Sequence, residues 1–165
     1  MAHTELIDGS LVVASPQRLV HMKAASLLER GLGWSAPADR YRVRRDMSVV
    51  LNVRQRPEPD VIVVHADADI SPEGTWYPAG AVVLAVEVVS PDSETRDRER
   101  KPVLYGEAGI RYFWRVEVGG GRLLVYSYEL DPATHQYWQM GIFHERMKAT
   151  LPFTMDIDLT EIDRI

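Results

Sequence analysis

Short apolar runs of strand length recur through the middle of the chain. Residues 61–64 and 82–89 are rich in β-branched side chains, and residues 111–118 and 122–130 flank a Gly-Gly-Gly turn. Because β-branched and aromatic residues favour the extended backbone, these segments predict strands, and the pair around the glycines predicts a hairpin. Further strands are expected at residues 41–45, 48–53, 137–143 and 147–153, and an edge hairpin at residues 5–14.

Two other segments have a helical pattern. Residues 17–30 carry an apolar stripe at helical spacing, and Ser15 with Pro16 predicts its start as N-cap and first helical residue. Gly31 and Gly33 predict its end. The stripe consists of Val20, Ala24, Leu27 and Leu28.

The second helical segment covers residues 90–109 and ends at Gly109. Pro102 lies inside it and disfavours helical geometry at Lys101, which predicts a kink or break there. The order of the elements predicts an α/β chain with a mixed central sheet, flanked by helices and extended by antiparallel strands after Arg122.

Composition limits the classes of protein that fit this chain. Its 165 residues with 45% hydrophobic content suit a single domain covering residues 1–165. It has no cysteine, so a bound metal would be held by carboxylates, carbonyls, imidazoles and water. With no signal-peptide pattern and no apolar run near the roughly 20 residues that cross a bilayer, no membrane association is expected and the cytoplasm is the expected location.

The net charge of −5 argues against a general nucleic-acid coat protein but does not exclude a local basic surface. Residues 40–56 contain six arginines and a single acid, Asp46. Residues 96–101 form a second basic cluster in which acids alternate with arginines. Such stretches can bind phosphates. An equally good interpretation is that these charged side chains only face the solvent.

Two acids belong to the apolar runs. Glu87 lies inside residues 82–89, and Asp60 follows Pro59 at the start of residues 61–64. A carboxylate in an apolar strand needs a partner, and two acids on adjacent strands would repel each other unless a cation lay between them. Each acid also has a simpler explanation: a turn for Asp60, and pairing of Glu87 with an arginine such as Arg45 or Arg54.

Three residues at four-residue spacing follow Glu87: Asp97, Lys101 and Tyr105. Only three of the nineteen lysines and arginines are lysines, so a lysine here suggests that a compact ammonium is needed. The alternatives are a surface ion pair with Asp97 and core packing for Tyr105. His21, alone on the first helix, is expected to be a surface or packing residue.

Taken together, these motifs resemble the Uma2 family of restriction-endonuclease-like proteins in the PD-(D/E)XK superfamily. Each motif is short, but their order and spacing extend over most of the chain. They are the segment from Glu5 to Gly9, Pro59-Asp60, Glu87-Val88-Val89-Ser90-Pro91, Asp97, Lys101, Tyr105, Gly109 and the segment from Tyr112 to Trp114.

This resemblance implies a restriction-endonuclease-like core in which Asp60, Glu87 and the Val88 carbonyl bind Mg²⁺ or Mn²⁺. The ion would activate a water molecule for attack on a DNA phosphodiester. The superfamily motif has a lysine two residues after the glutamate, where this chain has Val89. Lys101 is the expected substitute.

The remaining site residues are expected to support this chemistry. Asp97 would orient Lys101, and Tyr105 would pack beside it. A homodimer would suit cleavage of two strands. The arginines expected to contact phosphates are Arg44, Arg45, Arg54 and Arg98.

Two other functions remain open on the sequence alone. Because Val89 replaces the usual lysine, the fold could be catalytically silent and bind nucleic acid or a protein partner through the arginines of residues 40–56. A glycosidase could use Asp60 and Glu87 as its two carboxylates, with Trp76 and Tyr77 as a sugar platform. The order of the motifs favours the nuclease.

Overall fold

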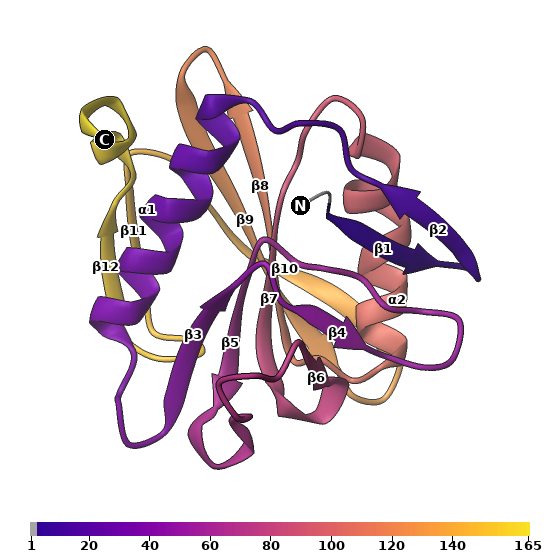
Figure 1. The fold of residues 1–165 in the computed structure, drawn as a ribbon. Coiled ribbons are helices and arrows are strands. Elements are labelled where there is room, and N and C mark those ends of the chain that lie inside the picture. Colours follow the sequence, from indigo (N-terminus) through magenta and orange to yellow (C-terminus); the bar gives the residue numbers. More distant parts are fainter. Residues whose placement is uncertain (1–2) are drawn as a thin grey trace.

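A six-stranded mixed sheet forms the centre of the computed structural model, which describes residues 3–165 (Figure 1). The strand order is β10-β9-β8-β7-β5-β3, and β7 and β8 are parallel whereas the other neighbours are antiparallel. The strands are β3 (Tyr41–Arg45), β5 (Val61–His65), β7 (Val82–Val88), β8 (Tyr112–Gly119), β9 (Arg122–Asp131) and β10 (Gln136–Phe143). This mixed sheet confirms the predicted fold class.

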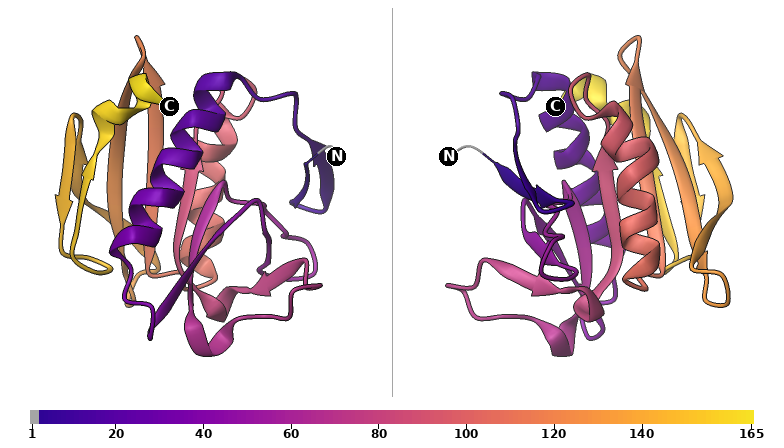
Figure 2. Two further views of the ribbon diagram at one scale, coloured as in Figure 1. Left: turned by 60° about the vertical axis from the view of Figure 1, so that its left-hand side comes forward. Right: turned by 90° about the vertical axis from the view of Figure 1, so that its right-hand side faces the viewer.

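The two helices cover opposite faces of this sheet. Side chains alternate between faces along a strand, so Val61 and Val63 pack with α1 (Leu19–Ser35), whereas Ile62 and Val64 share a cluster with Tyr105 of α2 (Lys101–Glu107). The hairpin of β11 (Arg146–Ala149) and β12 (Met155–Asp158) also packs on the α1 side (Figure 2). Every residue of β7 is buried, because both of its faces are covered.

Smaller elements border the central sheet. The predicted edge hairpin is present as β1 (Thr4–Ile7) and β2 (Ser10–Val13), and it forms a sheet of its own. β4 (Ser48–Val50) pairs in parallel with β6 (Trp76–Pro78), so the strand predicted at residues 48–53 does not join its neighbour β3. Short 3₁₀ segments are Ala66–Ala68, Ala79–Ala81 and Leu159–Arg164.

The first helix differs from its prediction at both ends. It begins at Leu19 without a side-chain cap, and the Ser15 backbone N–H instead donates to Asp92 Oδ2 at 3.4 Å. It also continues through both glycines to Ser35, so the predicted end was wrong. A Cβ on Gly31 would lie 2.9 Å from the side chain of Ile157, so this glycine permits close packing of α1 against β12.

The irregularity predicted at Lys101 is present. Residues Arg96–Arg100 form a π-helical stretch that leads directly into α2, and Pro102 follows at the start of α2. The helical backbone therefore changes its winding at Lys101 and does not break. Gly109, with φ of +81°, ends the segment as predicted. In the described part of the chain, neither helix is long and apolar enough to cross a membrane.

Two glycine substitutions test this packing. A Cβ on Gly106 would lie 2.5 Å from the backbone oxygen of His135, whereas a Cβ on Gly33 meets nothing within 4 Å. We expect Gly106→Ala to lower the free energy of unfolding by about 1–3 kcal/mol through overpacking. Gly33→Ala should raise it by about 0.5–1 kcal/mol because alanine favours the helix. Urea unfolding followed by circular dichroism measures both, and equal effects would contradict the close contact between α2 and the turn before β10.

Candidate functional site

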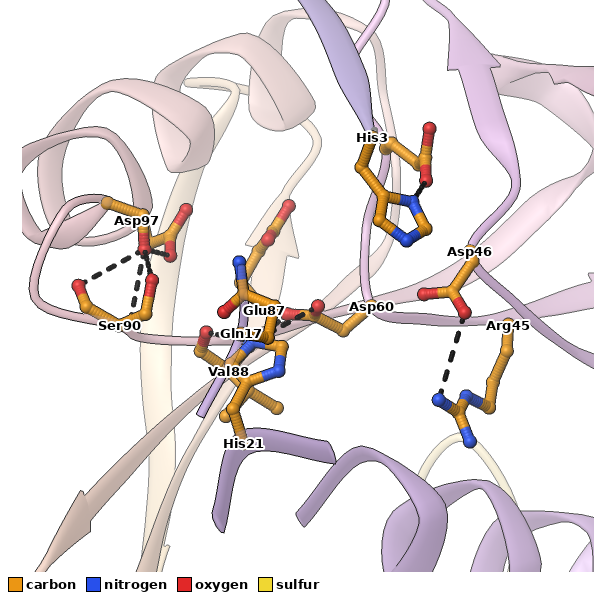
Figure 3. A network of polar contacts seen from close by, with 12 residues as sticks. His3, Gln17, His21, Arg45, Asp46, Asp60, Glu87, Val88, Ser90 and Asp97 are labelled. Atoms are coloured by element: carbon orange, nitrogen blue, oxygen red, sulfur yellow. Dashed lines mark hydrogen bonds and ion pairs between the residues drawn. The ribbon is translucent and has the colours of Figure 1, made fainter. Parts of the chain in front are cut away.

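Asp60 and Glu87 lie side by side at one end of the sheet. Val61 lies opposite Val86 in the antiparallel pair β5–β7, and the Asp60 backbone N–H donates to Val86 O at 3.0 Å. This hydrogen bond places Asp60 beside the end of β7 that carries Glu87, and both acids line the same cavity. The two acids singled out in the sequence are therefore brought together (Figure 3).

The Asp60 side chain is fixed by two contacts. Its Oδ2 accepts a hydrogen bond from the Val88 backbone N–H at 2.6 Å. Its Oδ1 lies 3.3 Å from Nε2 of His21, on α1. Thus Asp60 faces the end of β7, and its carboxylate lies between that strand and the first helix.

His21 was not selected from the sequence, yet it belongs to this site. Its side chain is buried, and Nε2 lies 3.1 Å from the Val88 carbonyl oxygen as well as near Asp60. Burial, the largest single cause, acts to lower the pKa of the imidazole, but Asp60, Val88 and Asp97 together outweigh it and raise that pKa. His21 is thus buried, as a packing residue would be, and it also makes polar contacts inside the site.

Lys101 reaches the same site from the other helix. Its Nζ lies 2.8 Å from Glu5 Oε1, 3.1 Å from Glu87 Oε2 and 3.2 Å from Asp97 Oδ1, and only 4% of its side chain is exposed. Burial alone would lower the pKa of the amine, but Glu87, Asp97 and Glu5 outweigh it and raise that pKa well above its usual value. Lys101 is therefore charged.

Glu87 is buried among these groups. Burial is the largest cause of a strongly raised pKa at this carboxyl group; Lys101 opposes it, and the neighbouring acids Asp97, Asp60 and Glu5 add to it. The Tyr105 hydroxyl donates a hydrogen bond to Glu87 Oε1. Tyr105 is fully buried in the apolar cluster beneath α2 and so joins the core to the site.

The charges of this cluster do not balance. Four acids, Glu5, Asp60, Glu87 and Asp97, face the single ammonium of Lys101 and the imidazole of His21. Burial and the neighbouring acids raise the pKa of Glu87 and of Asp97, and a further cation among the acids would relieve that repulsion. The oxygen donors of Asp60, Glu87 and the Val88 carbonyl are those that hard divalent ions prefer, so the residues present fit such an ion.

These groups line a cavity of about 510 Å³. Its wall also includes His3, Asp46 and Glu58, whose ligand atoms lie within 4.8 Å of one another. The His3 ring hydrogen bonds to Glu58, and Asp46 is held at a positive φ of 52°. A second polar group therefore borders the site. Its three residues carry no sequence pattern that identifies them.

Two arginines face this cavity, Arg45 and Arg96. Their Nε atoms are buried and have no hydrogen-bond partner among the described residues. The other three arginines predicted to contact phosphates do not line the cavity. Their closest polar partners are Asp69 at 2.5 Å for Arg44, the Asp8 carbonyl at 2.7 Å for Arg54, and Glu117 at 2.6 Å for Arg98.

The aromatic pair considered as a sugar platform lies elsewhere. Tyr77 is buried in the α2-side cluster, with its hydroxyl bound to Asp69 and Arg44, and neither Trp76 nor Tyr77 lines the cavity beside the two acids. Glu87 pairs with Lys101 and not with Arg45 or Arg54. This placement removes the aromatic support for a glycosidase.

Comparison with known proteins assigns the family. A family model described as "Putative restriction endonuclease" matches residues 1–160. The chain belongs to the Uma2 family. A crystal structure described as "a putative nuclease belonging to DUF820" from Anabaena variabilis covers 96% of this Uma2 chain and 88% of its own, with a TM-score of 0.73 at 14% identity. That likeness confirms the predicted restriction-endonuclease-like fold, while no curated protein matches the chain.

The buried ammonium predicts a large effect on stability. Lys101→Ala should lower the free energy of unfolding by about 3–5 kcal/mol, because it leaves buried carboxylates without their cation. The control is Lys148→Ala on an exposed position of β11, which should change it by less than about 0.5 kcal/mol. Urea unfolding at neutral pH measures both values, and a Lys101→Ala variant as stable as the control would show that the cluster contributes little.

Proposed function

We propose that this Uma2 protein is a metal-dependent endonuclease that hydrolyses phosphodiester bonds in DNA. The observation that carries the proposal is the meeting of Asp60 and Glu87 on neighbouring strands, with Lys101 at 3.1 Å from Glu87, in the wall of one cavity. Membership of the Uma2 family supports the same activity.

Asp60, Glu87 and the Val88 carbonyl would hold Mg²⁺ or Mn²⁺. When bound, such an ion lowers the pKa of a coordinated water and stabilises negative charge on a phosphate oxygen. Asp60 is oriented for this role by the Val88 N–H, and Glu87 by the Tyr105 hydroxyl. Because β7 is buried on both faces, the ligands are held on a rigid strand.

Lys101 takes the place of the motif lysine, since Val89 occupies the usual position. Its raised pKa keeps Nζ protonated, so it acts as a hydrogen-bond donor and a fixed positive charge and not as a base. From α2 it reaches Glu87 at the same time as Asp97 and Glu5. We infer that its positive charge favours the ionised form of Glu87 and orients that carboxylate, and that Asp97 holds the ammonium in place.

Arg45 and Arg96 would bind the phosphates of the substrate strand. Both line the cavity, and their guanidinium groups carry the positive charge that attracts a phosphate. Arg44, Arg54 and Arg98 lie outside the cavity lining, so their contacts would be with phosphates farther along the nucleic acid. A homodimer, which would bring two such sites to the two strands of a duplex, stays a prediction.

A plasmid-nicking assay tests this proposal. Wild type should nick supercoiled DNA with Mg²⁺ or Mn²⁺ and not with EDTA. Asp60→Asn and Glu87→Gln should each lower the rate by at least about 100-fold, because each removes a charge that stabilises the reacting phosphate. The matched controls are Asp39→Asn and Glu73→Gln at exposed positions, which should retain the wild-type rate.

The outcomes separate the nuclease from the silent fold. Equal nicking by all five proteins would identify a contaminant and remove the assignment. Metal binding without nicking of DNA or of an RNA substrate would favour a catalytically silent nuclease-like fold. The role of Lys101 in nicking is tested with Lys101→Arg, which keeps the positive charge. Lys101→Ala is less suitable because it is expected to lower the stability of the protein.

A further inference from the structure

We propose that His21 is itself a ligand of the ion in this site, through Nε2, and that the site therefore selects a first-row transition ion such as Mn²⁺ over Mg²⁺. The inference rests on the proposed function, because it concerns the same ion. It adds a nitrogen donor from α1 to the oxygen donors of Asp60, Glu87 and Val88.

The geometry supports a ligand role. Nε2 of His21 lies 3.1 Å from the Val88 carbonyl oxygen and 3.3 Å from Asp60 Oδ1. In an octahedral site with bonds of about 2.1 Å, neighbouring ligand atoms are roughly 3 Å apart. His21 Nε2 therefore lies at the spacing of adjacent ligands from two oxygen donors, Val88 O and Asp60 Oδ1.

The position of His21 is fixed by packing. It lies in the first turn of α1, where its backbone N–H donates to Arg18 O at 3.0 Å, and its residue is only 9% exposed. Ala24, Ala25 and Leu28 of the same helix are buried against the sheet. The imidazole is thus brought to the end of β7 by a rigid element, as a metal ligand requires.

The donor chemistry distinguishes the ions. Mg²⁺ prefers carboxylate, carbonyl and water oxygens, whereas imidazole nitrogen favours first-row transition ions. Mn²⁺ accepts both kinds of donor, so a site with His21 beside Asp60 and Glu87 should bind it more tightly than Mg²⁺. Nε2 faces two acceptors, Val88 O and Asp60 Oδ1, so it carries a proton in this arrangement. Binding of the ion would displace that proton to solvent, and the ring would bind through Nε2 with its remaining proton on Nδ1.

A purely orienting role for His21 is the competing explanation. A hydrogen bond to Asp60 would order that carboxylate for any divalent ion, so its loss would weaken Mg²⁺ and Mn²⁺ equally. A ligand role predicts a selective loss. His21→Ala should raise the dissociation constant of Mn²⁺ by about 10–100-fold and change that of Mg²⁺ by less than about threefold, measured by calorimetric titration of each ion into the full chain.

Spectroscopy tests the bond directly. Electron spin echo measurements on Mn²⁺ bound to wild type, prepared with ¹⁴N- and with ¹⁵N-histidine, should show a nitrogen coupling that changes with the isotope. That coupling should disappear in His21→Ala and persist in His144→Ala, an exposed histidine outside the cavity. The wild-type measurement does not depend on whether any variant folds.

His3 provides the necessary second control, because with Asp46 and Glu58 it forms another possible nitrogen-containing group at the cavity. A coupling that is lost in His3→Ala and kept in His21→Ala would overturn the assignment to His21. Mn²⁺ bound with no histidine coupling in wild type would also overturn it, while leaving the proposed function standing. If neither Mn²⁺ nor Mg²⁺ binds, the proposed function fails and the role of His21 fails with it.

Discussion

The contacts of the Lys101 ammonium are the interaction on which the site depends. They join three parts of the chain, because Glu5 comes from the edge hairpin, Glu87 from the central strand β7, and Asp97 from the π-helical stretch. Removing a buried charge from such a cluster costs about 3–5 kcal/mol, a large fraction of the stability of a small domain. Glu5 extends the connection by accepting from the Glu58 backbone N–H at 2.7 Å, just before Asp60.

The same cluster explains why burial and function coincide here. Glu87 is almost fully buried, and a single ammonium faces four carboxyl groups in the wall of the cavity, so burial and the neighbouring acids raise the pKa of Glu87. Burying negative charge without a partner costs free energy unless a further cation compensates the charge. Carboxyl groups with shifted pKa values in a cavity are typical of functional sites. In the proposed site, Lys101 supports one side of the β7 end and His21 the other.

The fold determines which groups can take part. Because α1 and α2 cover opposite faces of the sheet, each delivers one basic side chain to the end of β7: His21 from α1 and Lys101 from α2. Close packing at Gly31 sets α1 against β12, and the π-helical winding before Pro102 leads into Lys101. A substitution that moves either helix would therefore displace a charge at the site.

The sequence by itself determined the strands of the central sheet, the two acids, the irregularity at Lys101 and the family, because β-branched runs, a lone carboxylate in an apolar strand and a proline in a helix are local signals. It missed β6 and β12, and the strand expected at residues 147–153 ends at Ala149. Tertiary structure alone decided the contacts of Glu5 and His21. His21 meets Val88 across 67 positions of the chain, and nothing in the helical pattern around His21 marks that contact. It likewise decided which arginines face the cavity. Local spacing sets the direction of a side chain within its own element, whereas the packing of the elements sets what that side chain meets.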